Sequence, residues 1–190
     1  MKFYARYALI MAAFMAVSTV LYAADAVSEW EALNKEGIEL YRARKYDQGE
    51  KIIKEALAIT EKRVGPNHPD VAASLELLSA LCYDQDRYAL AEPLILRALT
   101  IYEKAKGADH PDVARNLNNL SAVYFSQGKY ALAEPLILRA LAIDEKTLGK
   151  KHIEVATDLF NLAALYRATD RTREAEPLVL RAHAIRAIPR

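Results

Sequence analysis

The twelve residues YALAEPLILRAL, from Tyr88 to Leu99, occur again letter for letter from Tyr130 to Leu141. The two copies lie 42 residues apart. The same step separates HPDVA at His68 from its second copy at His110, and leads on to the related HIEVA at His152. Identity over twelve residues at a fixed period indicates internal duplication. The chain is therefore predicted to consist of one unit repeated along the sequence.

Each unit is predicted to form two amphipathic helices joined by a short turn. In the third unit, Pro111 suits the first position of a helix, where its missing N–H costs nothing. Apolar residues follow at helical spacings of three and four. Residues 126–129 make the turn, and the second helix ends near Gly149, because glycine tolerates a positive φ. Neither helix buries its apolar stripe alone, so the units are expected to stack.

Three prolines, Pro93, Pro135 and Pro177, fall at one phase inside the second helix of their units. A proline inside a helix removes one backbone hydrogen bond and bends the helix. Because the position is the same each time, we expect a repeated bend rather than three helix ends.

These patterns resemble the tetratricopeptide repeat. In the third unit the resemblance is carried by Leu117, Leu120, Ser121, Tyr124, Gly128, Tyr130, Ala133, Ile137 and Ala140. The 42-residue period and the HPDVA opening are similar to the longer variant found in kinesin light chains. HEAT repeats have a similar length, but they do not explain the Gly-x-Tyr-x-x-Ala order around Gly128. The resemblance implies an all-α fold, a right-handed α-solenoid of four helix-turn-helix repeats at about residues 27–65, 66–107, 108–149 and 150–190.

Residues 1–26 are predicted to be a signal peptide rather than part of the fold. A short basic start precedes an uncharged run of 16 residues from Tyr7 to Tyr22, and Ala24-Asp25-Ala26 fits the A-x-A cleavage pattern. Cleavage is expected after Ala26, with cleavage after Ala23 as the alternative. The protein is thus expected to be periplasmic or secreted by a bacterium. An uncleaved membrane anchor is the other alternative, although 16 helical residues reach only ~24 Å of a ~30 Å hydrocarbon core.

Composition excludes several classes of function. The chain has 190 residues, of which 53% are hydrophobic, so disorder is not the expected state. Its 26 Lys and Arg residues balance 25 Asp and Glu residues, which gives no footprint for nucleic acid. The single cysteine, Cys82, excludes an intrachain disulfide and a multi-cysteine zinc site, and its phase places it in the core.

The resemblance also implies a concave groove, lined by the first helix of each unit, that binds peptides or protein segments. Asparagine amides suit a peptide backbone, aromatic rings supply contact area, and arginine suits a carboxylate. The alternative is that these residues are solvated helix faces, or that the two phenylalanines are packed. Carried over by position, the candidate groove residues are Asn34, Tyr41, Glu76, Tyr83, Arg115, Asn118, Asn119, Phe125, Phe160, Asn161 and Arg167. A C-terminal carboxylate clamp is not expected, since only Arg115 matches its pattern.

No enzyme, cofactor or metal site is expected. The histidines at His68, His110 and His152 lie one per unit, about 10 Å apart if the helices are packed. Ligand nitrogens must come within about 2.1 Å of one zinc ion, so these residues are interpreted as helix starts. Phosphate-binding loops, serine elbows and His-Glu metal motifs do not occur in the sequence.

The resemblance and the sequence together leave two functions open. The first is a non-enzymatic protein-protein interaction module that binds a peptide or protein segment in its groove. The second is a structural scaffold subunit that docks through its convex or C-terminal end surface, with self-association there. For that end, Leu162, Leu165 and Leu178 are expected to leave apolar surface exposed. The alternative is that the arginines of the last unit keep it soluble.

Overall fold

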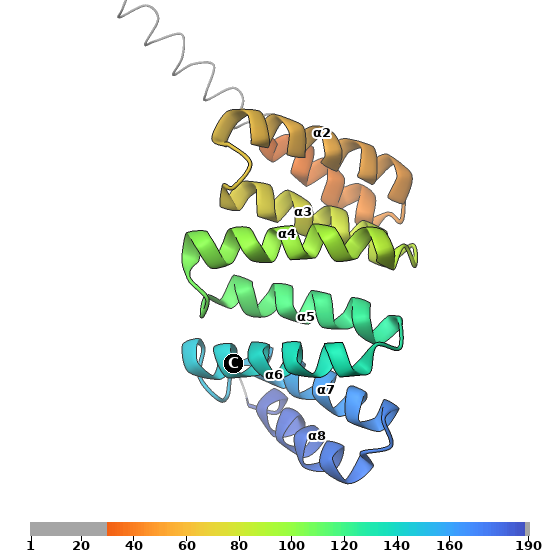
Figure 1. Cartoon of the computed structure of the whole chain (residues 1–190), viewed down its shortest axis with the longest axis vertical. Coiled ribbons are helices and arrows are strands. Elements are labelled where there is room, and N and C mark those ends of the chain that lie inside the picture. Colours follow the sequence, from red (N-terminus) through yellow and green to blue (C-terminus); the bar gives the residue numbers. More distant parts are fainter. Residues whose placement is uncertain (1–29, 189–190) are drawn as a thin grey trace, which may run out of the picture. The chain divides into compact units, whose positions relative to one another are not determined.

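The computed structural model describes residues 30–188, and in this range the chain forms helices and no strand (Figure 1). The chain divides into two compact units, one up to Asn67 and one from His68 onward. The predicted leader and its cleavage site lie outside the described residues. Between residues 30 and 188, no helix is both long enough and apolar enough to cross a bilayer.

The first unit contains a helix at residues 30–42 and α2 (Tyr46–Val64). Ile53 and Ala56 of α2 are fully buried, so the inner face of α2 carries the core of this unit. At the edge of the pair, the Arg63 guanidinium lies 5.5 Å from the centre of the Trp30 ring.

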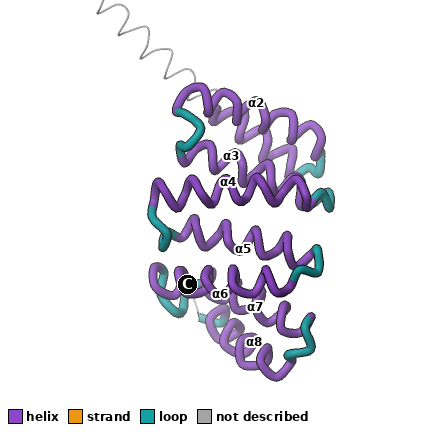
Figure 2. The backbone as a smooth tube through the Cα atoms, in the orientation of Figure 1, coloured by secondary structure: helices purple, strands orange, loops and turns teal. Residues whose placement is uncertain are grey.

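The second unit contains three helix pairs joined by short loops (Figure 2). Each helix packs against the next one along the chain, and α5 also contacts α7. The predicted all-α helix-turn-helix architecture is confirmed. The six helices are α3 (Pro69–Tyr83), α4 (Tyr88–Lys106), α5 (Pro111–Ser126), α6 (Tyr130–Thr147), α7 (Ile153–Ala168) and α8 (Thr172–Arg186).

The three repeated histidines begin the first helix of each pair in the second unit. The Nδ1 atoms of His68, His110 and His152 accept a hydrogen bond from the backbone N–H two residues on, at 3.2, 3.1 and 3.3 Å. An acceptor at this position satisfies one of the N–H groups that a helix start leaves without a partner. Their interpretation as helix starts is confirmed.

The repeated prolines lie where the period predicts. Pro93, Pro135 and Pro177 are inside α4, α6 and α8, and each helix continues past its proline. All three are exposed, so the carbonyl that loses its N–H partner faces the solvent side of the unit.

The core is built from small and branched side chains on facing helices. Cys82 is 2% exposed and packs with Ala91, Ile95 and Leu120, so its predicted core position is confirmed. Alanine at such positions lets neighbouring helix backbones approach closely.

The expected apolar surface at the C-terminal end is wrong for the residues that the sequence suggested. Leu162 and Leu165 are 3% and 0% exposed, because Ala175 and Leu178 of α8 pack against them. The last helix covers its own partner. The large exposed apolar side chains at this end are instead Leu180, at 71%, and Ile188, at 44%.

Candidate functional site

A cavity opens between the first helices of the second unit, on the surface formed by α3, α5 and α7, which we call the first-helix face. Its volume is about 200 Å³. Three of the predicted groove residues meet here, one from each helix. The lining residues are Tyr83, Ser121, Ala122, Phe125, Ile137, Asn161 and Ala164.

The aromatic walls of this cavity are held in fixed orientations. The Tyr83 ring meets Tyr88 edge-on, with the centroids 5.4 Å apart, and its hydroxyl lies 3.0 Å from Ser126 Oγ. One repeat later, the Phe125 ring meets Tyr130 in the same way at 5.3 Å. In each pair the last turn of a first helix contacts the tyrosine that begins the second helix. Because contacts already hold the rings in place, binding of a ligand would cost little side-chain entropy.

The asparagines of the first-helix face differ in how their amides are used. Asn118 donates to Asp158 Oδ1 at 2.5 Å, and its own Oδ1 lies 3.5 Å from Asn161 Nδ2. Asn119 is half-buried, and across residues 30–188 its side chain makes no hydrogen bond. Arg167 is exposed at the end of α7 and makes no ion pair with the described residues. Asn119 and Arg167 therefore have polar groups to offer a ligand.

Glu76 and Arg115, two other predicted groove residues, bind each other across the repeat boundary. Arg115 Nε and Nη2 donate to the two Glu76 oxygens at 3.0 and 3.1 Å. Asn116 Nδ2 and the Tyr102 hydroxyl also donate to this carboxylate, at 2.6 and 3.1 Å. Burial and the adjacent Glu76 carboxylate raise the pKa of the Tyr102 hydroxyl, which keeps it a donor. The carboxylate is thus committed to holding α3, α4 and α5 together.

Sequence reasoning missed a buried pair of acids, Asp144 of α6 and Asp158 of α7. Their exposed fractions are 4% and 0%, and Asp144 Oδ1 and Asp158 Oδ2 have no hydrogen-bond partner among the described residues. Burial raises the pKa of Asp158 to about 7, against the lowering effect of the Asn118 amide. Burial and the nearby Glu154 raise the pKa of Asp144 as well. The arrangement favours one shared proton between the two carboxyl groups.

A signal for this pair exists in the repeat alignment. Position 158 falls 42 residues after Asn116 and 84 after Ser74, and all three side chains are fully buried. A polar residue that recurs at a core phase indicates hydrogen bonding between repeats, since a buried polar group without a partner is costly.

The remaining predicted residues have contacts within their own helix pairs. In the first unit, Asn34 Nδ2 donates to the Trp30 carbonyl at 2.9 Å. The Tyr41 and Tyr46 rings lie 6.1 Å apart. In the second unit, the Phe160 ring packs against α8, with the His183 ring at 5.2 Å and the Arg186 guanidinium at 4.7 Å. Of the two phenylalanines, Phe125 lines the cavity and Phe160 does not.

Between residues 30 and 188, no three histidine, cysteine or acidic side chains come close enough together to hold a metal ion.

Comparison with known proteins identifies the repeat. A sequence model of the tetratricopeptide repeat matches residues 31–104, 79–146 and 112–187. Among solved structures, BtubC (BKLC) from P. vanneervenii superposes with a TM-score of 0.76 at 24% identity, over 85% of this chain and 67% of that chain. A Podosopora anserina protein described as a kinesin light chain with nearly identical TPR-like repeats gives a TM-score of 0.73 at 22% identity, over 83% and 74%.

A third solved structure, MamA from Desulfovibrio magneticus RS-1, gives a TM-score of 0.62 at 18% identity, over 83% of this chain and 76% of that chain. No curated protein sequence matches significantly. At these identities the likeness to solved structures shows the fold alone.

Proposed function

The chain belongs to the tetratricopeptide repeat family, and from this premise we propose that it is a non-enzymatic interaction module whose first-helix face binds an extended segment of a partner protein. The predicted leader at residues 1–26 supports export, so the partner would be met in the periplasm or outside the cell.

One observation carries the proposal: a cavity of about 200 Å³ has braced aromatic walls and includes Asn161 among its lining residues. This volume suits one apolar side chain of a peptide rather than a whole small molecule, for which pockets reach about 300–1,000 Å³. Asn119, whose amide makes no hydrogen bond within the described residues, lies on the same helix as Phe125. An amide both donates and accepts, so it suits a peptide backbone.

The test is to fill the cavity. Ala164 is exposed and lines it, so Ala164→Leu places a larger side chain where the ligand would sit. Combined with Asn119→Ala, it should lower partner recovery from a periplasmic extract at least about tenfold, with unchanged helicity. Ala105→Leu, at an exposed position near the end of α4, is the matched control. Equal recovery by both variants would exclude the first-helix face as the binding surface.

A structural scaffold is the second candidate, because one observation favours it. The second helices α4, α6 and α8 carry a row of exposed leucines at two positions that recur with the 42-residue period, and large exposed apolar patches mark interaction sites. The row consists of Leu90, Leu96, Leu132, Leu138 and Leu180, between 42% and 71% exposed. Under this alternative Leu138→Glu abolishes partner recovery, whereas the Ala164→Leu, Asn119→Ala variant leaves it intact.

A further inference from the structure

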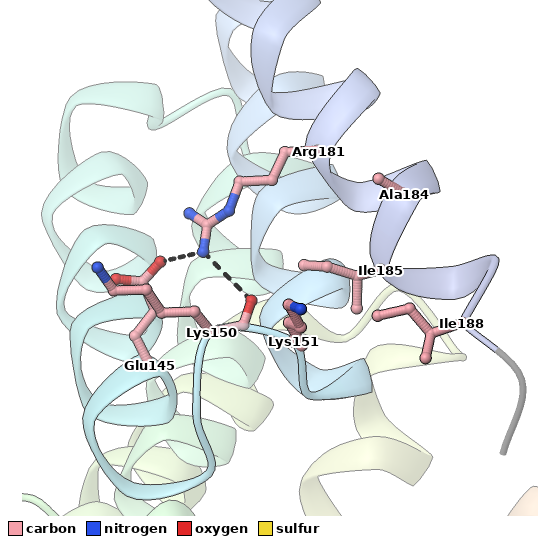
Figure 3. A pocket seen from close by; sticks show the side chains of 7 residues that line it. All are labelled: Glu145, Lys150, Lys151, Arg181, Ala184, Ile185 and Ile188. Atoms are coloured by element: carbon pink, nitrogen blue, oxygen red, sulfur yellow. Dashed lines mark hydrogen bonds and ion pairs between the residues drawn. The ribbon is translucent and has the colours of Figure 1, made fainter.

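A second hollow lies between α6, α8 and the loop after α6 (Figure 3). We call it the terminal pocket. Its volume is about 680 Å³, within the range of ligand sites in proteins. One side of it is apolar and the other is charged. Its lining residues are Glu145 of α6, Lys150 and Lys151 of the following loop, Arg181, Ala184 and Ile185 of α8, and Ile188.

One ion pair borders the terminal pocket. We call the ion pairs at this position of a repeat, together with the backbone carbonyl that the arginine contacts, the frame. Arg181 Nη2 lies 2.5 Å from Glu145 Oε1 and donates to the Lys150 carbonyl at 3.3 Å, as the dashed lines in Figure 3 show. These contacts hold α8, α6 and the loop after α6 in place. Since Arg181 and Glu145 neutralise each other, the net charge of the pocket comes from its other residues.

The same frame occurs 42 residues earlier in the chain. Arg139 Nη2 donates to Glu103 Oε1 at 2.7 Å and to the Ala108 carbonyl at 3.3 Å. There, however, Lys146 Nζ lies 2.5 Å from Asp109 Oδ2. This earlier frame therefore carries two cations and two carboxylates, in two ion pairs.

In the terminal pocket the second ion pair is replaced on both sides. The position of Asp109 holds Lys151, and the position of Lys146 holds Ile188. Lys150 stands where the earlier frame has Ala108. Both lysines are exposed, and neither makes an ion pair with any described residue. The substitutions thus leave three cations against one carboxylate, beside an apolar wall that is open where the earlier frame has a salt bridge.

We propose that the terminal pocket binds an acidic segment of a partner protein that carries one branched apolar side chain. The apolar side chain packs against Ile185 and Ile188, the second of which is 44% exposed, and its burial supplies the hydrophobic part of the affinity. Carboxylates on either side of it meet Lys150 and Lys151.

The lining favours this ligand over a simple anion. Exposed lysines each add little binding energy in water, so the apolar wall must contribute, and a phosphate or sulfate ion makes no use of it. Ala184 also lines the pocket, and its small side chain takes up little of the space beside Ile185. None of the pocket residues lines the cavity of the first-helix face, so this site does not rest on the function proposed above.

The probe is a fluorescein-labelled peptide with the sequence Gly-Glu-Asp-Leu-Asp-Glu-Gly, titrated with the full chain by fluorescence anisotropy. Two matched peptides replace either the four acids by their amides or the leucine by serine. Binding of both controls should be at least about tenfold weaker, and the affinity for the acidic peptide should fall as salt is raised. Equal binding of the amide peptide, or of the serine peptide, would overturn the proposal.

The decisive variants exchange the two frames. K151D/I188K introduces the earlier ion pair into the terminal pocket and should weaken binding at least about tenfold with unchanged helicity. D109K/K146I makes the reverse change and should raise the stoichiometry from one peptide per chain toward two. K104D alters a lysine of α4 that does not line the pocket, with the charge change of K151D, and should bind like the unmodified chain.

Three results contradict the assignment. K104D weakening the binding as much as K151D/I188K would reduce the effect to net charge. Unchanged affinity of K151D/I188K would place the peptide elsewhere. Binding to phosphatidylglycerol vesicles that K151D/I188K abolishes, without binding to the peptide, would make the pocket a membrane contact. The A164L variant separates the two proposals, since it should keep full affinity for this peptide.

Discussion

The boundary between α3 and α5 and the boundary between α5 and α7 have the same polar pair with its members exchanged. At the first boundary, Glu76 of α3 accepts from the Asn116 amide of α5 at 2.6 Å. At the second, Asn118 of α5 donates to Asp158 of α7 at 2.5 Å. Glu76 and Asn118 occupy one repeat position, and Asn116 and Asp158 occupy another. The helices thus present the same geometry with acid and amide reversed.

The neighbours of each acid decide its chemistry. Glu76 receives hydrogen bonds from Tyr102 and Arg115 as well as from Asn116, so its charge is matched. The repeat position of Tyr102 holds Asp144 at the second boundary, and that of Arg115 holds Thr157. Asp158 therefore has one amide donor and faces a second acid in place of a hydroxyl donor.

Duplication and later divergence of the repeats therefore acted on separate properties of these boundaries. The duplicated backbone places the same two positions in contact at both boundaries, whichever residues occupy them. The substitutions then produced one boundary with a hydrogen-bonded Glu76 carboxylate, and another at which Asp158 is expected to hold a proton. Buried carboxyl pairs resist double ionisation, so the second boundary is expected to respond to pH between about 4 and 7.

The largest effect is expected at the first boundary. Glu76→Ala leaves the Tyr102 hydroxyl without its acceptor, and leaves the fully buried Asn116 amide with the Asp112 carbonyl alone. The loss should lower the free energy of unfolding by about 2–3 kcal/mol in urea titrations. Asn118→Ala at the same repeat position is the matched control. It should cost less, about 1–2 kcal/mol, because it leaves one buried group, the Asp158 carboxyl, without its donor. A larger loss for Asn118→Ala would invert the comparison.

The second expected effect is a pH dependence located at the α5–α7 boundary. The pKa of Asp158 in the folded chain, about 7, lies above its ordinary value of 3.8, so the folded state binds a proton that the unfolded state releases. The contribution of Asp158 to the free energy of unfolding is therefore greatest below about pH 4, and it is lost as the pH rises to about 7. The free energy of unfolding is expected to fall over this pH range, and hydrogen exchange in α7 and α8 should become faster with it.

Asp158→Asn tests this assignment. The amide can still accept from Asn118 and can donate to Asp144, so the variant should lose the slope between pH 4 and 7 and be more stable than the unmodified chain at pH 8. Asp109→Asn is the control, since Lys146 lowers the pKa of that exposed acid and its effect belongs below pH 4. An unchanged slope in Asp158→Asn would remove the acid pair as its source.

The sequence predicted the parts of the fold that depend on local pattern. The period and the apolar spacing predicted the helix pairs, the HPD and HIE openings predicted the helix starts, and Cys82 was correctly placed in the core. The prediction failed for Leu162 and Leu165, because spacing does not show that α8 folds back over them.

The candidate site was predicted only in part, for a physical reason. Glu76 and Arg115 are 39 residues apart, and helical periodicity carries no information on which side chains meet across stacked repeats. Three predicted groove residues do line one cavity, because their repeat phase places them on one face. The pairing of Asp144 with Asp158 depends on the packing of α6 against α7. In the sequence its only sign is a polar residue at a repeat position that is buried in the core.

The two boundaries also differ at a cation that begins the second helix of the later repeat. Lys129 Nζ lies 4.0 Å from Glu92 Oε2 and 5.6 Å from the centre of the Tyr124 ring. One repeat on, Arg171 Nη1 donates to both Glu134 oxygens at 2.9 and 2.8 Å, and its guanidinium lies 3.9 Å from the centre of the Tyr166 ring. The same position thus carries a loose contact in one repeat and a close one in the next.

Exchanging these cations is expected to give the smallest effect. Lys129→Arg should raise the melting temperature and Arg171→Lys should lower it, each by about 1–2 °C, since a planar guanidinium both binds a carboxylate and stacks on a ring, whereas an ammonium does so less closely. Differential scanning fluorimetry of both variants and of the double exchange measures this. High salt should shrink both shifts, because the contacts are partly exposed. If both variants changed the melting temperature in the same direction, the choice between lysine and arginine would not explain the difference between the two contacts. The backbone of each repeat would then decide how well the contact forms.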